Sequence, residues 1–99
     1  MRRFNALMLD TYRRALVEIK YNASYFVRMV AERGGVEAAR ALILAPSVSD
    51  GFTRLWEAQR LDLSVEAHVL KPEFASLFTD DERQIARDRL REYGYRPGV

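Results

Sequence analysis

Apolar side chains recur at every third or fourth position along most of this 99-residue chain, and this spacing limits the fold more than any other feature. Residues three or four apart share one face of an α-helix, whereas a half-buried strand alternates at every second residue. We find no convincing alternation of the second kind. The sequence therefore predicts an all-α fold, a compact single-domain bundle of five or six mostly short helices.

The length of the chain predicts one domain over residues 1–99, with residues 95–99 as a flexible tail after the last helix. A chain of this size buries about two-thirds of its unfolded surface. That leaves room for one core, but not for a core and a large catalytic cleft. The composition, with 48% apolar and 30% charged residues, is ordinary for a globular domain.

One apolar seam with helical spacing runs through the N-terminal third of the chain. It fits either one helix over residues 4–33 or two helices that separate near Tyr21, and the capping preference of Asn22 favours the separation. A seam of this length also favours pairing, so we expect the helical segment 9–30 to mediate self-association or contact with a protein partner. The seam consists of Leu9, Tyr12, Leu16, Ile19, Ala23, Phe26 and Val30.

Local start and stop signals divide the middle of the chain. The pair Gly34–Gly35 ends the N-terminal helical region, and Pro46 ends the next helix. Ser49 or Asp50 is expected to cap a third helix, and Ser64 a fourth. We expect these helices over residues 36–44, 50–58 and 65–70, followed by a turn that begins at Pro72.

The strongest local signal is Thr79 followed by Glu82 three residues later. These two residues form a capping box, in which each side chain accepts a hydrogen bond from the backbone N–H of the other residue. Asp80 and Asp81 fall in the first turn, where the helix dipole favours negative charge. We expect this helix to continue to about Tyr93.

Large apolar residues on the inner faces of these helices form the expected core. Trp56 is included because it lies beside Phe52 and Leu55 in one short helix. The full set is Leu16, Ile19, Phe26, Val30, Leu42, Phe52, Leu55, Trp56, Leu63, Val69, Phe74, Leu77, Phe78 and Leu90.

Charge is distributed unevenly, although the formal net charge is only +2. Residues 1–35 carry a net charge of +4, residues 36–82 carry −5, and residues 83–99 carry +3. The two basic ends could bind nucleic acid or an acidic partner. They could instead pair within the molecule with the acidic middle, which we favour because surface charge is normal in helical domains.

The basic ends supply the candidate contact residues for nucleic acid or an acidic partner. Three of them are spaced by four on the last predicted helix and therefore share one face. Tyrosines at 12, 21 and 25 interleave with the N-terminal group, but their helical spacing is more typical of a core. The candidates are Arg2, Arg3, Arg13, Arg14, Lys20, Arg83, Arg87 and Arg91.

Acidic side chains crowd residues 57–73, and we interpret them as structural ion-pair partners. Arg60 is expected to bridge Asp62 or Glu66 in a partly buried pair that fixes geometry. His68 is the one histidine, and the chain has no cysteine, so we expect no metal site and place His68 as a partly exposed helix residue. No nucleophile has a suitable base near it in the sequence, so we expect no catalytic residue and no cofactor.

The segment GFTRLW at residues 51–56 and the segment RLDLSVE at residues 60–66 belong to one longer pattern. It continues with PEF at 72–74, LFT at 77–79, Glu82 and ARDRL at 86–90. This pattern resembles a family of small uncharacterised bacterial helical proteins, some of which occur as tails on larger proteins. The resemblance covers about residues 21–95. It implies a bacterial, helical, stand-alone domain and carries over no activity and no catalytic residue.

Hydropathy argues against a membrane protein. The longest apolar run, residues 41–45, is far shorter than the ~18 residues that a spanning helix needs. The N-terminal arginines are not followed by an apolar signal segment, so we expect a cytoplasmic protein without membrane contact. The function expected from the sequence is a non-enzymatic helical interaction module that binds a protein partner. The alternative is a nucleic-acid-binding accessory protein that uses the basic N-terminal and C-terminal helices.

Overall fold

Helices account for all the regular structure of residues 2–95, the part of the chain that this computed structural model describes. The expected all-α fold is therefore confirmed. The α-helices are α1 (Arg2–Glu18), α2 (Ser24–Arg33), α3 (Gly35–Leu44), α4 (Asp50–Glu57), α5 (Val65–Val69) and α6 (Asp80–Glu92). Two 3-10 helices, η1 (Leu61–Leu63) and η2 (Pro72–Leu77), flank α5.

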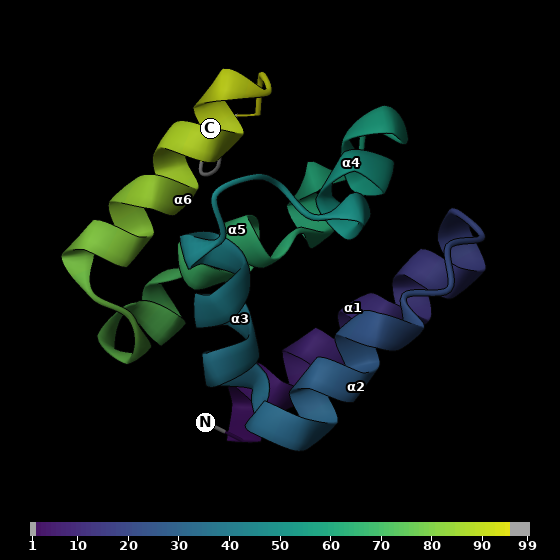
Figure 1. The fold of residues 1–99 in the computed structure, drawn as a ribbon, viewed down its shortest axis with the longest axis horizontal. Coiled ribbons are helices and arrows are strands. Elements are labelled where there is room, and N and C mark those ends of the chain that lie inside the picture. Colours follow the sequence, from purple (N-terminus) through teal and green to yellow (C-terminus); the bar gives the residue numbers. More distant parts are fainter. Residues whose placement is uncertain (1, 96–99) are drawn as a thin grey trace.

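The helices are arranged around a central pair, α3 and α5. Figure 1 shows α1 and α2 side by side as a hairpin on one side of the molecule and α6 on the other, with α3 and α5 between them. The short helix α5 packs against both α3 and α6. Because α5 lies at the centre, every one of its five residues is buried, including the polar Glu66 and His68.

The N-terminal region forms two helices, which decides between the two interpretations of the sequence. The chain leaves α1 at Lys20, which has a left-handed φ of +59°, and the Tyr21 N–H donates to the Ala15 carbonyl at 3.1 Å. The assignment of Asn22 as a cap was wrong. Ala23 occupies the N-cap position of α2, while the Asn22 side chain accepts a hydrogen bond from the Tyr12 hydroxyl at 3.1 Å.

The buried face of α1 differs from the predicted seam. Leu9 and Leu16 are 45% and 39% exposed, so the placement of Leu16 in the core was wrong. The helix carries two adjacent stripes with helical spacing, and the one that faces the core begins at Phe4. Its buried members are Phe4, Met8, Thr11 and Ala15.

The Gly34–Gly35 pair ends α2 and starts α3, as the sequence predicts. Gly34 has a left-handed φ of +83°, which favours glycine. Gly35 lies so close to α1 that a Cβ there would approach the Asn5 Oδ1 atom to 2.5 Å. Instead, Asn5 Oδ1 accepts a hydrogen bond from the Gly35 N–H at 2.7 Å, so a side chain from α1 satisfies a free donor at the start of α3.

All three capping predictions for the second half of the chain are confirmed. The Ser49 side chain accepts from the Phe52 N–H, and the Ser64 side chain accepts from the Ala67 N–H. Thr79 and Glu82 form the complete capping box of α6. These signals are local, because each joins residues only three positions apart.

Two groups of buried side chains form the core. Phe4 lies at the centre of the first group, where its ring meets Phe74 and Phe78 edge-on. The second group is built around Phe52 and Leu90. Most of the predicted core is buried in one group or the other, and Ile19, Phe26, Leu42 and Leu77 pack partly buried at the edges.

Trp56 is the other exception to the predicted core. Its side chain is 46% exposed, and its ring packs edge-on against Tyr93, the C-cap residue of α6, with a centroid separation of 5.6 Å. The helix α4 is short and turns Phe52 and Leu55 inward, which leaves Trp56 at its outer edge. Trp56 therefore covers the second core group instead of belonging to it.

The C-terminal end of the described chain is anchored at Tyr95, whose N–H donates to the Leu90 carbonyl at 2.9 Å. The rest of the expected tail, residues 96–99, lies outside the described residues. None of the helices between residues 2 and 95 combines the length and the apolar character needed to cross a bilayer.

Candidate functional site

Four of the eight basic candidates line one groove. Arg14 comes from α1, and Arg83, Arg87 and Arg91 come from α6. The groove has a volume of about 820 Å³. The fifth cation of the groove is Lys71, which follows α5. It was not among the candidates predicted from the sequence, because only the tertiary structure brings it next to the four arginines.

The three arginines of α6 line the groove because they are four residues apart. At a rise of 1.5 Å per residue, their backbones follow one another at intervals of about 6 Å along the helix. Arg91 pairs with Asp88 on the same helix, and the one side-chain partner of Arg87 among residues 2–95 is the neutral Gln84. The row thus presents positive charge that the described part of the molecule only partly compensates.

The cation on the opposite wall, Arg14, pairs with Glu18 one turn later in α1 at 2.9 Å. Lys71 has no carboxylate within ion-pair distance in the part of the chain that the structure describes. Two carboxylates, Asp10 and Asp62, also line the groove. Both already pair with arginines outside it, Asp10 with Arg13 and Asp62 with Arg60.

His68 lies in the lining of the groove and is buried, with 2% of its surface exposed, so its expected partial exposure was wrong. Its Nε2 atom lies 2.6 Å from the Thr11 hydroxyl oxygen on α1. Burial, with the nearby positive charge of Lys71, lowers the pKa of His68 to about 4. The imidazole is therefore neutral at physiological pH.

Two buried side-chain nitrogens of residues 2–95 lack a hydrogen-bond partner, and both belong to this groove. They are His68 Nδ1 and Arg83 Nε. Buried polar atoms are nearly always paired, and an unpaired one costs about 1–3 kcal/mol. The groove thus combines uncompensated cations at its surface with two unpaired nitrogens buried behind it.

The other four basic candidates lie outside the groove. Arg3 pairs with Glu73 of η2 at 3.0 Å, and Arg13 pairs with Asp10 one turn earlier in α1. Arg2 and Lys20 are exposed. The favoured interpretation, in which the basic ends pair with the acidic middle, is therefore right for Arg3 but wrong for the candidates that pair within their own helices.

Arg60 forms the expected ion pair with Asp62, one of its two alternative partners. Arg60 Nε donates to Asp62 Oδ1 at 3.1 Å, and its guanidinium also bonds to Glu18, which joins η1 to the end of α1. Glu66 instead accepts from Arg89 on α6 at 3.1 Å, with both side chains nearly buried. No local pattern predicts that pair, because its members are 23 positions apart.

Among residues 2–95, no three side chains of the His, Cys, Asp or Glu types are arranged to hold a metal ion. The neutral His68 has a threonine hydroxyl beside it, but both groups are buried. Comparison of the chain with protein-family models, curated proteins and solved structures found no match.

Proposed function

We propose that this domain is a non-enzymatic interaction module that binds an acidic segment of a partner protein in the groove between α1 and α6. The observation that carries the proposal is the convergence of five cations from three separate parts of the chain on one groove. Three of them, Lys71, Arg83 and Arg87, have no carboxylate partner among residues 2–95. Uncompensated charge in a groove attracts ligands of opposite sign and aligns them.

The arginines of α6 fit carboxylate ligands well. A guanidinium presents donors in a planar fork that pairs with a carboxylate through two hydrogen bonds. Arg83 and Arg87 are one turn apart and face the same groove, so two acidic side chains of an extended segment can be held in register. The apolar Leu7 and Leu70 in the lining would pack against the aliphatic parts of the same segment.

Two features favour protein over nucleic acid as the partner. First, Asp10 and Asp62 lie in the lining, where they would repel a continuous chain of phosphates. Second, grooves that hold single-stranded nucleic acid stack bases on aromatic side chains, and Tyr95 is the one aromatic residue in this lining. A protein segment can place its carboxylates opposite the cations and leave the two aspartates uncontacted.

The proposal is tested by fluorescence anisotropy with three labelled probes. These are a peptide rich in Glu and Asp, a single-stranded oligothymidine of equal charge, and a DNA duplex. We expect the peptide to bind most tightly, with an affinity that falls as salt is added. The variant Lys71→Gln/Arg87→Gln should weaken peptide binding about tenfold, because two charge-assisted contacts are lost.

A matched control separates the groove from net charge. Arg2→Gln/Lys20→Gln removes the same two residue types at exposed positions outside the groove, and it should bind like the wild type. If both variants lose the same peptide affinity, the effect comes from net charge alone, and the proposal that the peptide binds in the groove is refuted. Tighter binding of oligothymidine than of the peptide, lost only in the groove variant, would replace the protein partner with nucleic acid.

A further inference from the structure

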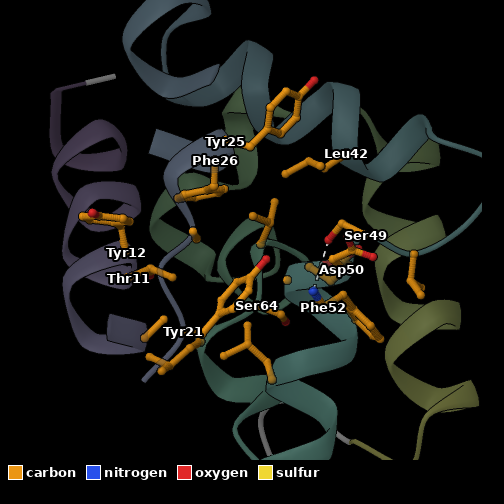
Figure 2. A pocket seen from close by; sticks show the side chains of 18 of the residues that line it. Thr11, Tyr12, Tyr21, Tyr25, Phe26, Leu42, Ser49, Asp50, Phe52 and Ser64 are labelled. Carbon is orange, nitrogen blue, oxygen red and sulfur yellow. Dashed lines mark hydrogen bonds between the residues drawn. The ribbon is translucent and has the colours of Figure 1, made fainter. Parts of the chain in front are cut away.

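A second cavity, of about 400 Å³, lies where α1, α2, α3, α4 and α5 meet, and the basic groove does not include it. Figure 2 shows its lining residues converging on one space from several helices. Aromatic and aliphatic side chains form most of the lining. They include Tyr12, Tyr21, Tyr25, Phe26, Leu42 and Phe52.

The three tyrosines that the helical spacing had assigned to a core lie in this lining instead. Tyr25 is 68% exposed and marks the edge that is open to solvent. The Tyr21 ring extends from the α1–α2 connection towards Ser49 and Asp50 in Figure 2, and its Cε2 atom lies 3.7 Å from the point that a Cβ on Gly51 would occupy. The Arg54 guanidinium already lies over the Tyr21 ring, with its Cζ atom 4.7 Å from the ring centroid.

Most polar groups of the lining are already engaged. The Ser49 side chain accepts from the Phe52 N–H, which is the dashed contact in Figure 2. The Ser64 hydroxyl donates to the Leu61 carbonyl, and the Thr11 hydroxyl contacts His68. Because these groups already form hydrogen bonds within the protein, they have little hydrogen-bonding capacity left for a ligand.

The charged residues of the lining are both acidic: Asp50 and Glu66. Glu66 is buried and paired with Arg89. Asp50 begins α4, and none of the ion pairs or side-chain hydrogen bonds found in residues 2–95 involves its carboxylate. Because Arg89 compensates Glu66, and Arg54 lies beside the cavity over the Tyr21 ring, Asp50 is the one carboxylate of the lining without an ion-pair partner among residues 2–95.

We propose that this cavity binds a small organic cation, a molecule with an apolar body and one ammonium group. The volume lies within the range of small-molecule pockets, which are mostly apolar with a few placed polar groups. The apolar body packs among Phe26, Leu42 and Phe52, and the ammonium group lies near Asp50. The unpaired carboxylate favours a ligand of opposite charge.

The proposal is tested by calorimetric titration with three probes of equal size and different charge: 4-phenylbutylamine, 4-phenylbutanol and 4-phenylbutyrate. We expect the amine to bind about tenfold more tightly than the carboxylate, with the alcohol between them. Asp50→Asn should weaken amine binding about fivefold and leave binding of the alcohol unchanged.

Asp80→Asn is the matched control, because Asp80 is the first residue of α6 just as Asp50 is the first residue of α4. Both variants lose a carboxylate at a helix N-terminus, so their melting temperatures should match, and only Asp50→Asn should change amine affinity. Three outcomes would overturn the proposal: no measurable binding of the amine, binding of the carboxylate as tight as that of the amine, or equal effects of the two variants.

Discussion

The Oγ1 atom of Thr11 on α1 lies 2.6 Å from the Nε2 atom of His68 on α5, and both side chains are buried. This contact ties the N-terminal hairpin to the central helix across 57 positions of sequence. It holds the imidazole in the lining of the basic groove, with Arg14 and Lys71 nearby. The histidine is thus a neutral structural group whose protonation would place a charge in the interior.

The first prediction concerns the pH dependence of stability. The pKa of His68 is about 4 in the folded protein, against an ordinary value of 6.5, because burial disfavours the charged form. Between these values the unfolded chain binds a proton that the folded chain does not, so the free energy of unfolding falls as pH decreases from 6.5 to 4. The full effect is on the order of 3 kcal/mol.

Urea denaturation of the wild type and of His68→Gln across this pH range measures the effect. Burial raises the pKa of Glu66, which contributes a dependence of opposite sign in both proteins. The difference between the two proteins therefore isolates His68. The stability of the wild type relative to His68→Gln should rise with pH, and parallel curves would show that His68 titrates normally.

The second prediction concerns Arg89, which donates to the Glu66 carboxylate and to the backbone carbonyls of Leu42 and Ala45. Arg89→Ala would leave a buried carboxylate and two carbonyls without their donor, at a cost of about 3–5 kcal/mol in unfolding free energy. Arg91→Ala, on the same helix, removes an exposed pair with Asp88 and should cost less than about 1 kcal/mol. Chemical denaturation measures both costs. Equal losses of unfolding free energy in the two variants would contradict the structural role of Arg89.

The third prediction concerns Trp56 at the outer edge of α4. Because its side chain is 46% exposed, Trp56→Ala should cost only about 1–2 kcal/mol, mainly through the lost contact with Tyr93. Leu90→Ala is the comparison within the same core group, where a fully buried side chain should cost about 2–5 kcal/mol. A larger loss for Trp56 than for Leu90 in thermal denaturation would place the tryptophan in the core after all.

The capping signals in the second half of the sequence were reliable because each depends on residues only three positions apart. Thr79 and Glu82 cap one another within a single turn, so residues only three positions apart define the start of that helix. The buried face of α1 was not determined in this way. Leu9 and Met8 belong to adjacent stripes of similar hydropathy, and contact with Phe74 and Phe78 at the Phe4 end selects the stripe that contains Met8.

The candidate site was partly predictable for the same reason. The shared face of Arg83, Arg87 and Arg91 follows from helical spacing alone. Arg14 and Lys71 join this row of arginines only because the fold brings α1 and α5 to the same groove as α6. The spacing of residues within the sequence does not predict that arrangement. The burial of a single histidine depends likewise on how the surrounding helices cover it.

The fourth prediction concerns self-association, which we propose for α1 in spite of the break before α2. Leu9 and Leu16 lie seven residues apart on one exposed stripe of α1, the spacing that two packed helices use. Sedimentation equilibrium should detect a concentration-dependent dimer that the variant Leu9→Gln/Leu16→Gln abolishes without loss of helicity. If the wild type remains monomeric at the highest soluble concentration, self-association through α1 is refuted.

The central claim is that an acidic protein segment binds between α1 and α6, and two-dimensional amide NMR during titration with the Glu- and Asp-rich peptide tests it most directly. We predict that the largest shift changes occur at Arg14, Lys71, Arg83 and Arg87, with little change at Tyr25 and Asp50 in the second cavity. Changes that are absent, spread evenly over the surface, or centred on the second cavity would contradict the account.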